Sequence, residues 1–492
     1  MIITLRQIFL IRIMNKNRYQ DIKRGFADMK KYFMYGVLGF VFSAVFQTTC
    51  IYGQNIEIQQ KEYIEKGSPL NKINLKDTSR DKTSRESQNP VQKQKRVVYI
   101  NLNKTGEKNI NKVKNSTEVS LHKEAVKENN GPNIEIGILS GCKQVQITGL
   151  QNFYISGASK EKNVYQQGNK VILEQSGNKI IVNGKKFDGP VYFSTDNDKS
   201  SFAVKGNQYR GKMKVIPSKW SSGLTVVNMI PIELYLRGVV PSEVIPSWEI
   251  DVVKAQAVAA RTYAVFHKNQ YRSAGYDLTD DTRSQVYKGA SAETEVTNKA
   301  IKSTSGEIIT YGGKAIDALF HANGGGYTED SENVWESYVP YLRGVKEEES
   351  RVLSKTWVKV VPIKEFSGSV AKSGYPVGKI KELILSRLKI GNKTSRDRGI
   401  SGRVKFLEVN GQYGKKQIPG ETLQSIFGLQ STLFDISIKG KDIIFTGYGW
   451  GHGLGLSQWG AKAMAEKYGD GKDYYKKILT HYFSGTKIEK IY

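Results

Sequence analysis

The chain changes character near residue 131, and this change limits what each part of it can fold into. Residues 54–130 are rich in Lys, Asn, Gln, Ser, Thr and Glu, and their few apolar residues show no period. Such a segment cannot bury enough apolar surface to offset the loss of chain entropy. The composition therefore predicts a disordered polar spacer over 54–130, with folded structure after it.

Short apolar or alternating runs follow at regular spacing between residues 131 and 222. Gly, Asn or Asp separates them, and they include IEIGIL, KQVQITG, NFYISG, NKVILEQ, NKIIVNG, PVYFST and SFAVKG. Alternation with a period of two, interrupted by turn residues, is typical of strands joined in hairpins. We therefore predict a β-rich N-terminal part over 131–222.

Residues 223–492 mix strand and helix patterns. LTVVNMI predicts a strand, VVPSEVIPSW a proline-bounded loop, and EIDVVKAQAVAARTYAVFHK a helix capped by Ser247. A glycine-rich loop at 447–456 precedes a second predicted helix, from Gln458, with Ser457 as its N-cap. The predicted class is α+β, a β-rich part followed by a mixed α+β domain. An apolar stripe at spacings of three and four runs along the first helix: Ile250, Val253, Ala257, Ala260 and Ala264.

Residues 1–53 carry an export pattern. The uncharged run FMYGVLGFVFSAVF occupies 33–46, directly after Lys30 and Lys31. A basic flank followed by an apolar run is typical of a secretory signal, and this run is near the short end of what spans a membrane. We therefore predict an N-terminal extension with a signal peptide or membrane anchor. The protein would be exported to the cell wall, the periplasm or the outer face of the cytoplasmic membrane.

The net charge and the number of cysteines and histidines limit which binding partners and metal sites can be expected. The formal net charge is +27, and for an exported chain an anionic wall polymer or membrane is a better partner than nucleic acid. Cys50 and Cys142 are the two cysteines of the sequence, which excludes a disulfide scaffold. The five histidines form no HExxH pair. We expect no metal and no other cofactor.

Glu243 is the first candidate for chemistry. It lies between Pro241 and Pro246, which restrict the backbone, and beside Val244 and Ile245. Apolar neighbours desolvate a carboxylate and raise its pKa, as a general acid at a glycosidic bond requires. A lone Glu in such a loop is also commonly a surface or capping residue.

Two glycine-rich stretches, HANGGGYTEDSENVW (321–335) and GYGWGHGLGLSQWGA (447–461), are further candidates. Their glycines permit a close approach between backbone and ligand, and their polar and aromatic residues suit a sugar. The second stretch matches neither a Walker loop nor GxGxxG, so a phosphate site is disfavoured. An ordinary turn with a helix cap, and a hydrogen-bonded structural histidine, are the alternative interpretations.

Three blocks taken together, LYLRGVVPSEVIPSWEIDVVKAQAVAARTYAV, FHANGGGYTEDSENVW and GYGWGHGLGLSQWGAKAMA, resemble those of one family. It is the stage II sporulation protein D (SpoIID) family, which includes the amidase-enhancer, or LytB-like, proteins. The resemblance implies that 223–492 is a SpoIID-like catalytic domain with lytic transglycosylase activity on peptidoglycan. Such enzymes cleave the MurNAc–GlcNAc bond without water, leave a 1,6-anhydro-MurNAc end, and prefer strands stripped of their stem peptides.

The resemblance also assigns roles to residues. Glu243 matches the catalytic glutamate, and Lys254 and Arg261 match basic positions on the helix that follows, where we expect them to face the glycan. Some relatives bind zinc through a Cys just before Gln-Val-Tyr, where this chain has Ser284, so no zinc site is expected. Substrate binding is expected of five further residues in the blocks: His321, Tyr327, Glu329, His452 and Gln458.

A second function stays open beside the enzyme, a non-catalytic wall-binding activator of an N-acetylmuramoyl-L-alanine amidase. An exported nucleic-acid binder is a third, but no RRM or KH motif supports it. The expected partners are peptidoglycan glycan strands, the amidase, and the membrane if the N-terminal segment is not cleaved. No nucleic acid is expected. The sequence leaves open whether the setting is sporulation engulfment or vegetative wall turnover.

Overall fold

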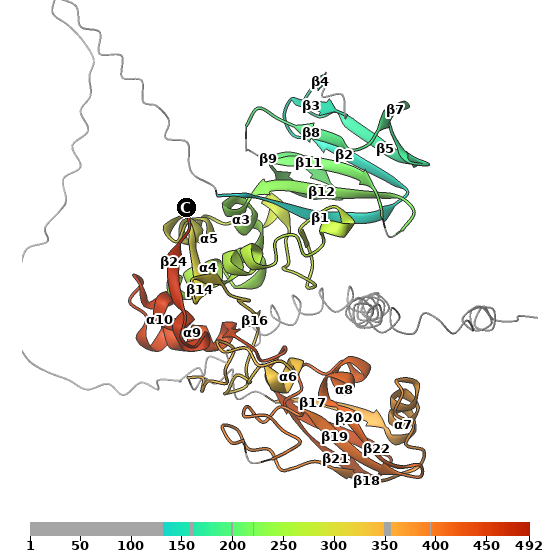
Figure 1. Cartoon of the computed structure of the whole chain (residues 1–492), viewed down its shortest axis with the longest axis vertical. Helices are drawn as coiled ribbons and strands as arrows, with labels where there is room; N and C mark the ends of the chain where they lie inside the picture. The colour runs from blue at the N-terminus through green and yellow to red at the C-terminus, as the bar shows by residue number, and fades with distance from the viewer. Residues whose placement is uncertain (1–130, 158–161, 198–199, 220, 349–355, 394) are drawn as a thin grey trace, which may run out of the picture. The chain divides into compact units, whose positions relative to one another are not determined.

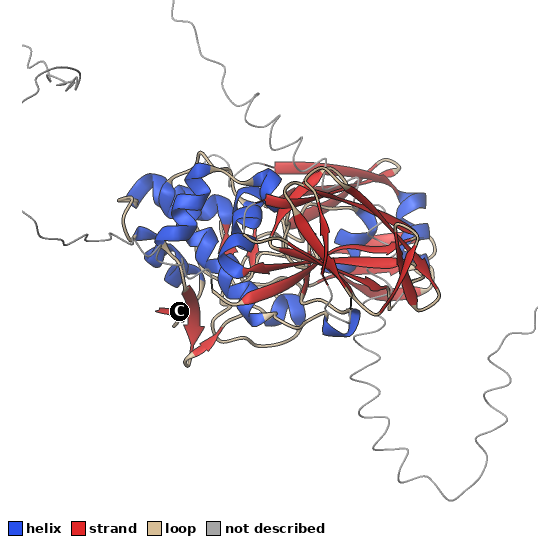
Figure 2. Ribbon diagram, turned by 90° about the horizontal axis from the view of Figure 1, so that it is seen from above, coloured by secondary structure: helices blue, strands red, loops and turns tan. Residues whose placement is uncertain are grey.

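The computed structural model describes residues 131–157, 162–197, 200–219, 221–348, 356–393 and 395–492 (Figure 1). The predicted export segment 1–53 and spacer 54–130 lie outside these residues. None of the helices within the described ranges combines the length and the apolar character needed to cross a membrane. The described residues form many strands and eight α-helices, which confirms the predicted α+β class (Figure 2).

Two antiparallel-rich sheets form the first folded part, at the positions of the predicted strand runs. In spatial order the larger sheet contains β13 (Leu278–Thr279), β1 (Asn133–Cys142), β12 (Leu224–Pro231), β11 (Lys212–Pro217), β8 (Val191–Ser194), β3 (Phe153–Ser156) and β4 (Lys162–Tyr165). The second contains β10 (Asn207–Arg210), β9 (Ser200–Val204), β2 (Gln144–Gly149), β5 (Lys170–Ser176), β6 (Lys179–Val182) and β7 (Lys185–Asp188).

The alternating residues of these strands build one hydrophobic core. In β1, Ile134, Ile136 and Ile138 are buried while the residues between them are more exposed, as the period of a half-buried strand requires. β12 pairs antiparallel with both β1 and β11. The sheet therefore continues across residue 222, where the sequence analysis placed a domain boundary.

Helices follow β12 and lie beside its end in Figure 1. They are α3 (Ile232–Glu243), α4 (Ile250–Phe266) and α5 (Glu295–Ser303), with the 3₁₀ turns η1 (Arg272–Ala274) and η2 (Gly289–Ala292) in the connections. The predicted stripe on α4 packs against the sheet core, whereas its opposite face, with Val252 and Val258, packs into a second core with α9 (Gln458–Tyr468) and α10 (Tyr474–Tyr482). The predicted cap is wrong, because α4 begins after Glu249 and Ser247 stays outside it.

Short strands complete this second core. They are β14 (Glu307–Tyr311), β15 (Lys314–Ala315) and β24 (Lys487–Lys490) in one sheet, and β16 (Phe320–His321) with β23 (Leu456–Ser457) in another. β16 and β23 pair in parallel, Phe320 with Leu456 and His321 with Ser457. The helix α6 (Glu332–Trp335) follows β16. This pairing brings together the two glycine-rich stretches, which are more than a hundred residues apart in the sequence.

Residues 356–448, between β16 and β23, form an inserted segment with its own hydrophobic core. Phe366 and Phe427 stack within it, and the ring of Phe445 is tilted against that of Phe427. One sheet contains β17 (Thr356–Pro362), β22 (Asp442–Tyr448) and β21 (Phe434–Lys439), and the other β18 (Ile380–Ile384), β19 (Phe406–Gly411) and β20 (Gly414–Pro419). The helices are α7 (Ile363–Lys372) and α8 (Gly420–Phe427).

Candidate functional site

Glu243 is the last residue of α3, and not a loop residue as predicted. Pro241 is accommodated in the final turn of the helix, where the hydroxyl of Ser242 donates to the carbonyl of Gly238 (2.9 Å). The helix ends at Val244, whose N–H still donates to Val240. Glu243 is therefore half-buried at the end of a rigid element, which is a more accurate support than a loop.

A backbone donor from a distant loop reaches this carboxylate. The N–H of Val286 donates to Oε1 of Glu243 at 3.0 Å. The loop can approach because position 238 is glycine: a Cβ there would lie 2.6 Å from a ring carbon of Tyr287. The sequence analysis did not identify Val286, because a backbone N–H has no side-chain pattern to reveal it.

The side-chain amide of Gln458, the first residue of α9, acts on the same carboxylate as a hydrogen-bond donor, and its Nε2 also lies 3.5 Å from Oε1 of Gln256. Ser457 caps this helix by accepting from the N–H of Gly460, as predicted. Burial raises the pKa of Glu243 to about 7, although the bonds from Val286 and Gln458 and the charge of Lys288 act to lower it. A carboxyl group with this pKa is partly protonated near neutrality, as a general acid requires.

Two tyrosines and a second carboxylate complete the surroundings. The charge of Glu243 acts on the phenols of Tyr235 and Tyr263, whose pKa values are raised mainly by burial. Asp280 also acts on Tyr235, and burial together with the charge of Asp281 raises the pKa of Asp280 to about 7. Asp280 is a titratable neighbour that the sequence analysis missed.

Arg261 points into the protein in the described structure, and the contact with the glycan expected for it stays a prediction. Its side chain is 0% exposed, and it donates from Nε (2.7 Å) and Nη2 (2.8 Å) to the carboxylate of Glu233. Nη1 also donates to the carbonyl of Glu307 (3.0 Å), and Nη2 to that of Ile301 (3.3 Å). Lys254 is half-buried, and its Nζ donates to the carbonyls of Gly471 and Lys472. Both cations are thus engaged within the protein.

The two predicted histidines are brought together, with ring centroids 5.2 Å apart. His321 is buried and its Nδ1 is 3.0 Å from the carbonyl oxygen of Leu454, while Nε2 of His452 is 3.1 Å from that of Phe320. Burial lowers the pKa of His452 to about 4 and that of His321 well below its usual value, and the charge of Arg403 adds to both effects. The pair is therefore neutral at physiological pH.

Glu329 and Tyr327 lie in the same block but in different surroundings. Glu329 is 0% exposed, and its carboxylate accepts from the amide of Asn333 and from residues 400–401 of the inserted segment. Tyr327 is half-buried, and its backbone forms a bridge with Lys346. Among the seven other residues predicted for the site, Gln458 alone is recorded as acting on Glu243 in the described structure.

Aromatic rings lie beside or next in sequence to several of the predicted site residues. Trp459 follows Gln458 in α9, and its ring lies edge-on to that of Trp248 at 4.7 Å between centroids. The ring centroids of Tyr263 and Phe320 are 6.4 Å apart, and those of Trp335 and His452 are 6.1 Å apart. Within the described ranges, no three His, Cys, Asp or Glu side chains come together in a way that could hold a metal ion.

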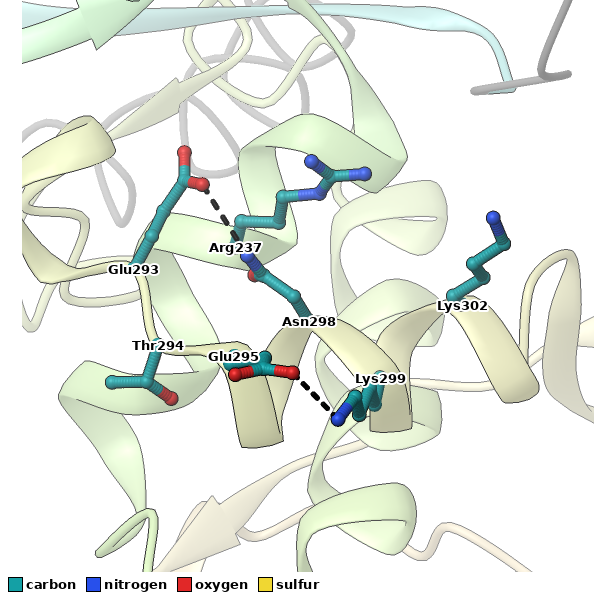
Figure 3. Close-up of a pocket in the computed structure, with 7 residues that line it drawn as sticks. All are labelled: Arg237, Glu293, Thr294, Glu295, Asn298, Lys299 and Lys302. Carbon is teal, nitrogen blue, oxygen red and sulfur yellow. Dashed lines mark hydrogen bonds and ion pairs between the residues drawn. The ribbon is translucent and has the colours of Figure 1, made fainter. Parts of the chain in front are cut away.

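A separate pocket of about 360 Å³ lies between α3 and α5 (Figure 3). Its acids already have partners: Glu293 pairs with Arg210 (2.5 Å) and Glu295 with Lys299 (2.6 Å). Glu243 does not line it, so this pocket is distinct from the candidate site. The lining residues are Arg237, Glu293, Thr294, Glu295, Asn298, Lys299 and Lys302.

Comparisons with known families match two parts of the chain. Residues 221–311 match a family described as stage II sporulation protein, which covers α3, α4 and the loop that carries Val286. Residues 357–455 match a family described as a domain of unknown function. The second match covers most of the inserted segment and the start of the second glycine-rich stretch.

Curated relatives extend these matches. The chain is 33% identical over 295 residues to a stage II sporulation protein D of Bacillus amyloliquefaciens, covering 56% of this chain and 78% of that protein. It is 33% identical over 320 residues to an uncharacterized protein of Brachyspira hyodysenteriae, covering 65% and 81%. It is 29% identical over 338 residues to an amidase enhancer of Bacillus subtilis, covering 61% of this chain and 46% of that protein. These similarities, together with the order of the three blocks, show that the chain belongs to the stage II sporulation protein D family.

Proposed function

We propose that this protein is a peptidoglycan lytic transglycosylase that acts on peptide-stripped glycan strands in cell-wall remodelling. The observation that carries the proposal is the Glu243 carboxyl group, half-buried at the end of α3 with a pKa raised to about 7. Membership of the family, and the names of the sporulation relatives, support the setting.

The geometry suits a reaction that needs a single carboxyl group. Protonated Glu243 donates its proton to the glycosidic oxygen as the C1–O bond breaks and positive charge develops on the MurNAc ring. The resulting carboxylate then accepts the proton of the C6 hydroxyl, whose oxygen forms the new bond to C1. No water is consumed and Glu243 ends protonated. Hydrolases normally require a second carboxylate to activate water or to attack C1.

Residues around Glu243 have separable tasks in this scheme. The Val286 N–H and the Gln458 amide stabilise the carboxylate that forms after the first proton transfer. The half-buried rings of Trp248 and Trp459 provide apolar surface beside Gln458 for a sugar face. Arg261 is given no contact with the glycan in this scheme, because its recorded hydrogen bonds go to protein groups.

The reaction is tested by incubating the full chain with amidase-stripped strands in water enriched in ¹⁸O. We expect anhydro-ended fragments without heavy oxygen, and fewer of them from intact sacculi. Reducing ends that carry ¹⁸O would identify a hydrolase and contradict the proposal.

The pH dependence follows from the raised pKa. Because Glu243 must be protonated to start the reaction, we expect kcat/KM on stripped strands, which reports the pKa of the free enzyme, to be constant below about pH 7. Above that pH it should fall by roughly tenfold per pH unit, as the acid form is depleted. Initial rates from pH 5 to pH 9, with folding checked at each pH, measure this limb. A rate that rises across this range would contradict Glu243 as the acid.

The alternative, a non-catalytic activator of an amidase, is favoured by one observation, the similarity to an amidase enhancer. An activator does not need the Glu243 carboxyl group. Stimulation of an N-acetylmuramoyl-L-alanine amidase by Glu243→Gln as strong as by the wild type, with no fragments from either protein, would favour this function.

A further inference from the structure

Residues 400–403 join the inserted segment to the first glycine-rich stretch. The buried carboxylate of Glu329 accepts from the backbone N–H of Ile400 and of Ser401, both at 3.0 Å. It also accepts from the hydroxyl of Ser401 at 2.5 Å. Hydrogen bonds to a charged acceptor are about twice as strong as neutral ones. Glu329 thus holds this part of the inserted segment in one position.

Arg403 extends the connection to the second glycine-rich stretch. It is 2% exposed, and it donates from Nη1 to the carbonyl of Gly451 (3.1 Å) and from Nη2 to that of Gly324 (3.3 Å). One guanidinium therefore touches both stretches. The approach is close: a Cβ at position 453, where φ is +84°, would lie 2.1 Å from the Nε of Arg403. Glycine at 453 is what leaves room for it.

The other side of this connection is fixed to the core of the inserted segment. Arg398 donates from Nη1 to the carbonyl of Phe434 (2.9 Å) and from Nη2 to the carboxylate of Asp435 (2.5 Å), both in β21. Its Nε donates to the carbonyl of Ser386 (2.7 Å). Residues 400–403 are therefore attached on one side to the core of the inserted segment and on the other to the two glycine-rich stretches. They fix the position of these stretches relative to that core.

The paired stretches lead directly to Gln458. Asn323 and Trp450 exchange backbone hydrogen bonds at 3.0 and 2.7 Å. The N–H of Gly324, whose carbonyl binds Arg403, donates to the hydroxyl of Ser457 (3.2 Å). Ser457 is the cap of α9, and Gln458 is its first residue. Two hydrogen bonds, Arg403 to Gly324 and Gly324 to Ser457, thus connect Arg403 to the cap of the helix that carries Gln458.

We propose that residues 400–403 form a clasp by which the inserted segment holds the two glycine-rich stretches together, and that Arg403 is a positioning residue that keeps Gln458 against Glu243. The inference rests on the proposed role of Glu243 and assigns a task to a segment that matches a family described as a domain of unknown function. The groups that act on Glu243 are the Val286 N–H, Gln458, Lys288 and the phenols of Tyr235 and Tyr263. Of these, Gln458 alone is carried by the stretches that the clasp holds.

The experiment compares Arg403→Met, Gln458→Leu and the double variant in the full chain. Because the bond from Gln458 favours the carboxylate form, its loss should raise the pKa of Glu243. This pKa is measured by ¹³C NMR of glutamate labelled at the carboxyl carbon, with Glu243→Gln to assign the signal. We expect each single variant to raise it, the double variant to raise it no further, and kcat to fall by about ten- to a hundredfold. The exposed Arg387→Met, also in the inserted segment, is the matched control and should change neither.

Additive shifts in the double variant, or an unchanged pKa in Arg403→Met, would overturn the proposal and leave the clasp a purely structural contact. If Arg403→Met does not fold, Arg403→Lys and Ser401→Ala carry the same comparison with milder changes. The NMR readout does not depend on turnover. Failure of the wild type to cleave glycan would therefore count against the proposed reaction, while the carboxyl titration would still decide the clasp.

Discussion

Glu243→Gln is expected to lower the rate of anhydro-end formation at least about a thousandfold. The amide keeps the shape of the side chain but can neither donate the proton that breaks the glycosidic bond nor accept the proton of the C6 hydroxyl. General acid and general base catalysis each contribute about 10²–10⁴-fold, and here one group performs both. Fragment mass spectra from stripped strands, with wild type and variant side by side, measure the loss.

Asp280→Asn is the matched control for this substitution. Asp280 also has a pKa raised to about 7 and also acts on Tyr235, so it resembles Glu243 in its electrostatics. It differs in geometry, because Val286 and Gln458 direct their hydrogen bonds to Glu243. We expect Asp280→Asn to retain activity within about tenfold. A larger loss for Asp280→Asn than for Glu243→Gln would assign the acid to Asp280.

Glu243→Gln also has a predictable effect on the free energy of unfolding, and measuring it shows whether this variant is folded. The pKa of Glu243 is raised from 4.5 to about 7 on folding, so burying its charge costs stability as pH rises through this window. The uncharged Gln avoids this cost. Glu243→Gln should therefore match the wild type near pH 4 and exceed it at pH 8, by up to about 3 kcal/mol. Denaturant unfolding at both pH values measures the difference.

Local sequence patterns predicted where helices and strands lie better than they predicted what each face of an element packs against. The stripe on α4 was identified from residues such as Val253 and Ala260, which do pack against the sheet core. Val252 and Val258 on the other face are equally buried, in the second core. A period of 3.6 reveals the side of a helix that is apolar, but alanine and valine on the remaining side are compatible with solvent or with a second layer. Only the fold decides between these.

The candidate site residues also differ in how much of their environment comes from their neighbours in the sequence. The raised pKa expected for Glu243 came from its immediate apolar neighbours, and the structure agrees. The position of Glu329 depends on Ser401, 72 residues further along the chain, and that of Arg403 on Gly324, 79 residues before it. Nothing near either residue in the sequence indicates such a partner. A resemblance to a family indicates which residues match its motifs. Whether such a side chain faces substrate or protein depends on contacts between residues that are far apart in the sequence.

For Arg261, the difference between facing the substrate and facing the protein has a large expected effect on stability. Its partner Glu233 lies 28 residues earlier, is 4% exposed, and also accepts from Gly306 and Tyr492. Arg261→Met removes the counter-charge and leaves a buried carboxylate unpaired, which typically costs 3–5 kcal/mol. We expect Tm to fall by about 10 °C. Lys254→Met, a cation on the same helix that binds exposed loop carbonyls, should change Tm little.

The double variant Arg261→Met/Glu233→Gln separates a structural role from a substrate-binding one. Because it removes both buried charges, it should recover much of the lost stability, since the penalty lies in the unpaired carboxylate and not in the missing guanidinium. Below its unfolding temperature it should also bind stripped glycan as the wild type does. If it regained stability but bound glycan at least about tenfold more weakly, the guanidinium would be required by the ligand. The buried pair with Glu233 would then open when the ligand binds, because in the closed pair the hydrogen bonds recorded for Arg261 go to protein groups, among them the carboxylate of Glu233 and the carbonyls of Glu307 and Ile301.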